Sequence, residues 1–264
     1  MTGPTNPVPR GPVPDPWVPL RAHTRARIGL RRAGETLATS EVLSFTAAHA
    51  LARDAVRTTL EIGSLTAELD GLGLGSTVPV RSAARDRDEY LRRPDLGRVP
   101  ADPDLLPRGR CDIALVVADG LSATAVAAHA AALSAALCAE LTPRYRFSMP
   151  VLATQARVAL GDHIGAALGA TVVLVIIGER PGLSVADSLG IYLTYAPRPG
   201  RADSERNCVS NIHPPDGLGY AAAAVTVADL VDRMTEAGRS GVAVKARGGP
   251  DAVAAPPPNT QLDQ

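Results

Sequence analysis

The sequence has little lysine, few aromatic residues and no net charge. Of its 27 basic residues only Lys245 is a lysine, and 27 acidic residues balance them. Aromatic residues make up 3% of the 264 residues. So few rings cannot form a stacking platform for bases, and a neutral chain has no field that attracts nucleic acid or an anionic membrane. We therefore expect no nucleic-acid partner.

Cysteine is scarce, and long apolar runs are missing. Cys111, Cys138 and Cys208 are odd in number and not closely paired, so they imply neither a disulfide framework nor a zinc site. No run reaches the ~20 apolar residues of a membrane span, and residues 1–19 are rich in proline and lack the apolar segment of a secretory signal. These absences predict a soluble intracellular protein without metal ligands or a membrane partner.

The chain is long enough for a substantial core, and its composition changes along its length. Residues 1–16 hold six prolines and are expected to form a disordered leader. Residues 17–100 are expected to be a helical N-terminal region, with a helix over 41–60. An α/β domain is expected over 108–245, and residues 246–264 are expected to be a disordered tail.

The second half alternates strand-like and helix-like segments. This alternation predicts an α/β fold: a Rossmann-like, mostly parallel sheet with helices on both faces, preceded by the helical N-terminal region. The stretch 197–219 is predicted to be a long polar loop, and such loops are usually functional or disordered. The expected strands are 112–118, 151–154, 171–177, 189–195 and 242–244, and the expected helices are 122–141, 157–168 and 220–237.

The most apolar strand candidate ends in a polar turn. Residues 172–177 are all apolar and mostly β-branched, as in a strand buried on both faces. Gly178, Glu179 and Arg180 follow directly. Open parallel sheets bind ligands beyond the carboxyl ends of their strands, so Glu179 is a candidate ligand contact. A solvated turn is the alternative.

Two other segments resemble known sites only in part. The glycines at 71, 73 and 75 suggest a dinucleotide loop, but they follow a helix and are better explained as its stop. Ser122 approximates a hydrolase nucleophile, and the chain order Ser122, Asp187, His213 permits a catalytic triad. The alternative is that Ser122 is only a helix N-cap. A stand-alone serine hydrolase and a non-catalytic α/β binding module are therefore kept as rival hypotheses.

Several motifs, in order, resemble one family closely. Over roughly residues 15–245 the chain is similar to the small (light) subunit of ethanolamine ammonia-lyase. The motifs are Arg25-Ala-Arg-Ile-Gly-Leu, Tyr90-Leu-Arg-Arg-Pro-Asp-Leu-Gly97, Val116-Val-Ala-Asp-Gly-Leu-Ser-Ala-Thr-Ala-Val126, Arg157-Val-Ala-Leu-Gly-Asp162, Ile177-Gly-Glu-Arg-Pro-Gly-Leu183, Tyr192-Leu-Thr-Tyr-Ala-Pro197 and Asn207-Cys-Val-Ser-Asn-Ile-His213.

The resemblance implies half of an adenosylcobalamin-dependent enzyme that converts ethanolamine to acetaldehyde and ammonia by radical chemistry. In that family the large subunit holds ethanolamine and the small subunit closes the other side of the cobalamin. The family's small-subunit cofactor contacts fall here on Val158, Glu179 and Cys208, with no catalytic side chain on this subunit. Ser122 and the turn 119–120 are expected to border the same crevice.

The resemblance also implies an assembly and a location. The expected partner is the large subunit, in a hetero-oligomer expected to be dodecameric, without which this chain is inactive. A cytoplasmic location is expected, and a bacterial microcompartment for ethanolamine degradation is one setting that the resemblance raises.

Overall fold

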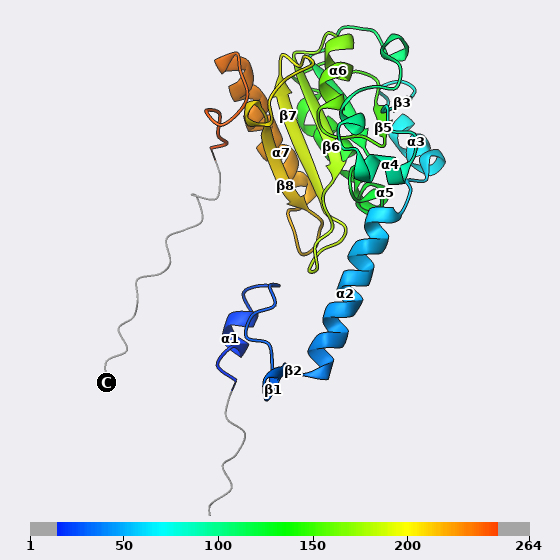
Figure 1. Ribbon diagram of the computed structural model, residues 1–264. Coiled ribbons are helices and arrows are strands. Elements are labelled where there is room, and N and C mark those ends of the chain that lie inside the picture. The colour runs from blue at the N-terminus through cyan, green and yellow to red at the C-terminus, as the bar shows by residue number, and fades with distance from the viewer. Residues whose placement is uncertain (1–14, 248–264) are drawn as a thin grey trace, which may run out of the picture. The chain divides into compact units, whose positions relative to one another are not determined.

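The computed structural model describes residues 15–247, and the chain divides into two compact units, one up to residue 50 and one from residue 51 (Figure 1). Nearly all of the predicted leader 1–16 and tail 246–264 lies outside the described residues.

The first unit contains short elements and the start of a long helix. A four-residue helix, α1 (Val18–Arg21), precedes a small antiparallel hairpin of β1 (Arg32–Ala33) and β2 (Thr36–Leu37). Helix α2 (Thr39–Arg57) then begins here and continues into the second unit, which confirms the helix predicted over 41–60. The Trp17 ring packs so closely on Gly29 that a Cβ at residue 29 would lie 2.1 Å from it.

The second unit is built on a six-stranded mixed sheet in the order β3-β5-β4-β6-β7-β8. The strands from β3 to β6 are parallel neighbours, whereas β7 is antiparallel to both β6 and β8. The α/β fold class predicted from the sequence is confirmed, with a sheet that is mixed rather than purely parallel. The strands are β3 (Val78–Arg81), β4 (Ile113–Ala118), β5 (Val151–Thr154), β6 (Val172–Gly178), β7 (Leu189–Tyr195) and β8 (Asn207–Ile212).

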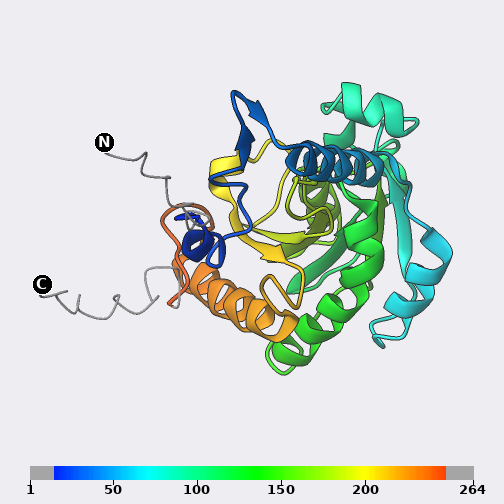
Figure 2. The ribbon, with the colours of Figure 1, turned by 90° about the horizontal axis from the view of Figure 1, so that it is seen from below.

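Helices cover both faces of this sheet. On one face α3 (Ile62–Asp70), α5 (Ala123–Leu141) and α7 (Tyr220–Ala237) bury their apolar residues, and α5 and α7 lie side by side (Figure 2). On the other face α6 (Leu160–Ala167) packs against β4 and β6. The remaining short elements are the helix α4 (Arg87–Arg92) and the 3-10 turns η1 (Leu96–Arg98), η2 (Pro103–Leu105) and η3 (Asp203–Glu205).

The central strands are buried throughout. Every residue of β4 and β6 is buried, which confirms the prediction that the run 172–177 forms a strand covered on both faces. Successive residues of a strand face opposite sides, so Leu174 and Val175 belong to different core clusters. The sheet therefore holds the carboxyl ends of these strands rigidly.

Helix α5 is long and apolar enough to cross a membrane by length and composition alone. In this fold its buried residues, among them Leu133 and Leu137, pack on the sheet and on α7. A core helix of this kind is apolar around much of its circumference. Its composition is therefore accounted for by the packing seen here.

Three strand predictions differ from the structure. β3 lies within the stretch 17–100 that was expected to be helical; its Pro79 is tolerated because β3 is an edge strand. β8 lies within the predicted loop 197–219, and its mixed polar sequence suits the opposite edge of the sheet. Residues 242–244 form no strand, although Val244 is buried in the core. Each miss concerns the margin of the sheet.

The predicted run of parallel crossovers also stops at β6. Only ten residues, 179–188, join β6 to β7. A parallel crossover needs a dozen or more residues, usually with a helix, so the short link returns β7 antiparallel. β7 and β8 thus extend the sheet as a meander beside the parallel half.

Candidate functional site

A cavity of about 420 Å³ lies at the carboxyl ends of the parallel strands. It is formed where β4 and β6 end, beside the residues that lead into α6 and the Tyr192 side chain of β7. This is the place where open α/β sheets bind ligands. The lining residues are Tyr90, Gly120, Leu121, Arg157, Val158, Ile177, Gly178, Glu179, Arg180 and Tyr192.

The floor of the cavity depends on two glycines from adjacent strand ends. Gly120 has a φ of +57°, and a Cβ there would lie 2.3 Å from the carbonyl oxygen of Gly178. A Cβ on Gly178 would in turn lie 2.2 Å from the carbonyl oxygen of Ser122. The Leu121 amide donates to the Gly178 carbonyl at 3.0 Å. Only glycine permits this close backbone approach, which brings the ends of β4 and β6 together.

Asp119, the residue after β4, holds the neighbouring loop in place. Its two carboxylate oxygens accept the backbone N–H groups of Gln155 and Ala156, each at 2.9 Å. Arg87 approaches the carboxylate at 3.5 Å and donates to the Gly120 carbonyl at 2.8 Å. Burial raises the pKa of Asp119. These N–H groups and the guanidinium lower it, but desolvation is the larger effect. Asp119 therefore joins the end of β4 to the loop that leads into α6.

Tyr90 and Arg157 form one wall of the cavity, and Arg87 also stacks on the Tyr90 ring. The guanidinium carbons of Arg157 and Arg87 lie 4.3 Å and 4.9 Å from the centroid of the Tyr90 ring. The Tyr90 hydroxyl donates to the Ala156 carbonyl at 3.0 Å, and burial raises its pKa far above the usual value. These cation–π contacts and the hydrogen bond fix the orientation of the wall.

Glu179 presents a partly satisfied carboxylate to the cavity. Ser188 Oγ donates to Glu179 Oε2 at 2.7 Å, and the Asn211 amide donates to the same oxygen at 3.3 Å. Within residues 15–247 no hydrogen bond reaches Oε1, which lies 3.0 Å from where a Cβ on Gly190 would be. The carboxylate is thus held by one oxygen, and the other remains able to accept a ligand N–H.

Cys208 lies next to the cavity rather than in its lining. It pairs across the strands with Tyr192, a lining residue. The residue is exposed, yet desolvation of its thiol, aided by the Glu179 carboxylate, raises the pKa of Cys208 to about 11. Desolvation and the same neighbours raise the pKa of Tyr192 to about 12. Both groups are therefore protonated near neutral pH.

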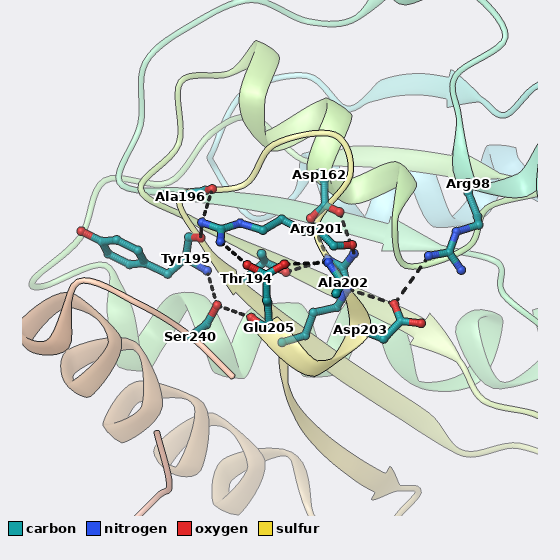
Figure 3. Close-up of polar contacts among 11 residues, drawn as sticks. Arg98, Asp162, Thr194, Tyr195, Ala196, Arg201, Ala202, Asp203, Glu205 and Ser240 are labelled. Carbon is teal, nitrogen blue, oxygen red and sulfur yellow. Dashed lines mark hydrogen bonds and ion pairs between the residues drawn. The ribbon is translucent and has the colours of Figure 1, made fainter. Parts of the chain in front are cut away.

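A buried ion pair connects the elements that carry these side chains (Figure 3). Arg206 binds Asp162 of α6 through two contacts of 2.7 Å, and both side chains are almost fully buried. Arg206 also donates to Thr194 Oγ1 of β7 at 2.9 Å. Asp162 follows Val158 by four residues, and Arg206 precedes Cys208 by two. The network thus joins α6 and β7 to the residue that directly precedes β8.

The structure brings the three predicted contact residues to one region. Val158 and Glu179 both line the cavity, and Cys208 reaches its edge through Tyr192. Gly120 also lines it, whereas the neighbouring Ser122 is fully buried beneath. The glycines at 71, 73 and 75 follow α3 directly, so their interpretation as a helix stop is confirmed.

The hydrolase alternative is wrong. Ser122 Oγ caps α5 by accepting the Ala125 amide at 3.1 Å, and it donates to the Ala186 carbonyl at 2.9 Å. His213 instead bonds Asn211, at 2.8 Å. Asp187 approaches a different histidine, His129, at 3.9 Å. The three side chains of the proposed triad are engaged elsewhere, and the serine has no exposed surface.

The sequence reading missed three cavity residues: Tyr90, Arg157 and Tyr192. Each is the first residue of a motif that supported the family resemblance, and this position could have marked it as a candidate site residue. Nothing in local spacing predicts that Tyr90, in α4, lies beneath Arg157, because residues 67 positions apart meet only through the tertiary fold.

The comparisons with known proteins agree on one family. The sequence profile of the ethanolamine ammonia-lyase light chain (EutC) family matches residues 14–245. A Rhodococcus erythropolis protein named ethanolamine ammonia-lyase small subunit is 54% identical over 245 residues, 93% of this chain and 95% of its own length. Proteins of the same name from Ralstonia nicotianae and Bradyrhizobium diazoefficiens are 47% and 49% identical, over 93% and 90% of this chain and 93% and 92% of their own lengths.

Proposed function

This chain belongs to the ethanolamine ammonia-lyase light chain family, and we propose that its cavity completes the adenosylcobalamin site of that enzyme. The observation that carries the proposal is the Glu179 carboxylate, fixed through Oε2 at the end of β6 with Oε1 without a donor from the described chain. Cobalamin carries amide side chains around its corrin ring, and these present N–H groups. A carboxylate that accepts an N–H forms one of the stronger hydrogen bonds in proteins.

The lining fits one edge of such a macrocycle. Val158 and Ile177 offer apolar surface, and Glu179 offers an acceptor. Tyr192 and Cys208, whose pKa values are raised to about 12 and about 11, are protonated near pH 7 and can therefore donate hydrogen bonds. At about 420 Å³ the cavity encloses only part of the cofactor, so a partner must cover the remainder.

The residues of this chain bind and orient rather than react. Adenosylcobalamin supplies radical chemistry when bound, and here that chemistry deaminates ethanolamine to acetaldehyde and ammonia. The stacked Tyr90 wall, the glycine floor and the Asp162–Arg206 pair keep the binding groups in fixed positions. Fixed donors and acceptors lower the cost of ordering when a large ligand binds.

The partner is the large subunit of the enzyme, and this chain alone has no activity. The names of the relatives, all small subunits, support a hetero-oligomer of the two chains. We place the assembly in the cytoplasm and give it the dodecameric form expected from the resemblance. Fractionation of the native cell, with and without a microcompartment fraction, tests the location, and mass measurement of the purified complex tests the stoichiometry.

Reconstitution tests the function. The chain, the large subunit, and an equimolar mixture are each given ethanolamine and adenosylcobalamin, and released ammonia is measured. Only the mixture should form ammonia and acetaldehyde. Ammonia release by this chain alone would contradict its assignment as a dependent subunit, and an inactive mixture containing a large subunit proved functional with another small subunit would contradict the assigned reaction.

A further inference from the structure

One arginine of the second unit lacks an acidic partner although it is partly buried. In the described part of that unit, four other arginines are buried or half-buried, and each of them forms an ion pair with an aspartate or a glutamate. Arg157 is the exception, and it lines the cavity. The pairs are Arg87–Asp119, Arg201–Glu205, Arg206–Asp162 and Arg233–Asp229.

Arg157 is held in place without being neutralised. Its guanidinium stacks on the Tyr90 ring at 4.3 Å, and its side chain passes Gly97, where a Cβ would lie 2.9 Å from Arg157 Cγ. Its backbone amide donates to the Gly97 carbonyl at 2.8 Å. The guanidinium itself makes one long contact, from Nη2 to the Tyr90 carbonyl at 3.5 Å, and Nε is buried without a partner.

A partly desolvated positive charge without a counter-charge is unfavourable unless a ligand supplies one. Arg180 is the other arginine in the lining, and no ion pair neutralises it within residues 15–247 either. Arg180 is exposed, however, so it is not held at the cavity as Arg157 is. The positive charge that the protein orients toward a ligand is therefore that of Arg157, whose planar fork matches a phosphate.

We propose that Arg157 binds the phosphodiester of the cofactor's nucleotide arm. This inference rests on the proposed function, because it assigns a second contact within the same cavity. The phosphodiester is the anionic group among the cofactor's amide side chains, so it provides the charge that Arg157 lacks. Glu179 would accept N–H groups from the amides, while Arg157 would donate to the phosphate. The two side chains thus recognise chemically opposite parts of one ligand.

Two ligands that differ in this anion test the inference. Adenosylcobalamin carries the phosphodiester, whereas adenosylcobinamide has the same corrin ring and upper ligand but lacks the phosphate and nucleotide. Each is titrated by absorbance into the complex of large and small subunits, with wild-type chain, Arg157→Met, Arg157→Lys or the control Arg92→Met. Arg92 is an exposed arginine of α4 outside the cavity.

We expect Arg157→Met to weaken adenosylcobalamin binding about tenfold or more, on the scale of a lost charged hydrogen bond, and to leave adenosylcobinamide binding unchanged. Arg157→Lys should fall between, and Arg92→Met should bind both like the wild type. Equal losses for both ligands would show that Arg157 only supports the wall, and no loss for either would remove it from the site. Failure of the wild-type complex to bind adenosylcobalamin would instead overturn the proposed function.

Discussion

Two buried aspartate–arginine pairs flank the cavity, and they are built differently. Asp162 and Arg206 face each other through two contacts of 2.7 Å, and those are the only hydrogen bonds to the carboxylate from the described residues. Asp119 and Arg87 approach only to 3.5 Å. Asp119 depends instead on two backbone N–H groups, and Arg87 on the carbonyls of Val56 and Gly120.

The same two residue types therefore stabilise the fold in different ways in the two pairs. The Asp162–Arg206 pair joins α6 to the residue that precedes β8, and the Asp162 carboxylate depends on Arg206 alone among the described residues. In the Asp119–Arg87 pair each side chain chiefly fastens backbone: Asp119 holds the loop after β5, and Arg87 holds the turn after β4. Breaking the first pair should therefore leave an isolated buried charge, whereas breaking the second should not.

The largest effect is expected from Arg206→Met. It leaves the Asp162 carboxylate buried without its partner, a change that typically costs about 3–5 kcal/mol of folding free energy. Urea unfolding of the purified protein measures the loss. Arg144→Met is the control, because Arg144 pairs with Asp232 where both side chains are well exposed, and such pairs contribute about 1 kcal/mol or less. Equal losses for the two variants would contradict the assigned role of the buried pair.

A smaller effect is expected from Arg87→Met. Asp119 keeps both of its backbone hydrogen bonds, and the change mainly leaves the Val56 and Gly120 carbonyls without a donor. Such losses cost about 1–3 kcal/mol. The same urea experiment should place this variant between Arg206→Met and Arg144→Met. If Arg87→Met were the most destabilised of the three, the contrast between the two pairs would be reversed.

A third effect is a pH dependence of stability that arises from Asp119. Burial raises its pKa in the folded state above the usual value of 3.8, so folding favours the protonated form. Its contribution to stability is fully present below that value and is lost as the pH rises through the folded-state pKa. The free energy of unfolding of the wild type, relative to Asp119→Asn, should therefore fall as the pH is raised from 4. The exposed Asp104→Asn variant is the control. A free energy of unfolding that rose with pH in the wild type, relative to Asp119→Asn, would contradict the prediction.

The central part of the fold could be predicted from the sequence, and the margins could not. The strands 151–154 and 189–195 and the helix 220–237 are found at the residues predicted, because apolar periodicity directly reflects burial. The edge strands β3 and β8 are half exposed, so their apolar pattern is weak. The direction of β7 depends on the length of the link after β6, which a reading based on repeated crossovers overlooks.

The candidate site divides in the same way. Glu179 could be predicted because a continuous apolar run ends directly before it, and the family motifs added Val158 and Cys208. The cavity wall could not be predicted, because the contact of Tyr90 with Arg157 and the pairing of Arg206 with Asp162 join segments far apart in the chain. The identity of a single residue does not show which distant residue it contacts, so these contacts are known only once the fold is known.

Cofactor titration of a Glu179 variant tests the central claim most directly. Adenosylcobalamin is titrated into the two-subunit complex containing either the wild-type chain, Glu179→Ala or the surface control Glu236→Ala. Loss of a hydrogen bond to a charged group costs about 1.5–3 kcal/mol, so Glu179→Ala should weaken binding roughly 10- to 150-fold while the control binds like the wild type. An unchanged dissociation constant for Glu179→Ala would remove the end of β6 from the cofactor site and contradict the account.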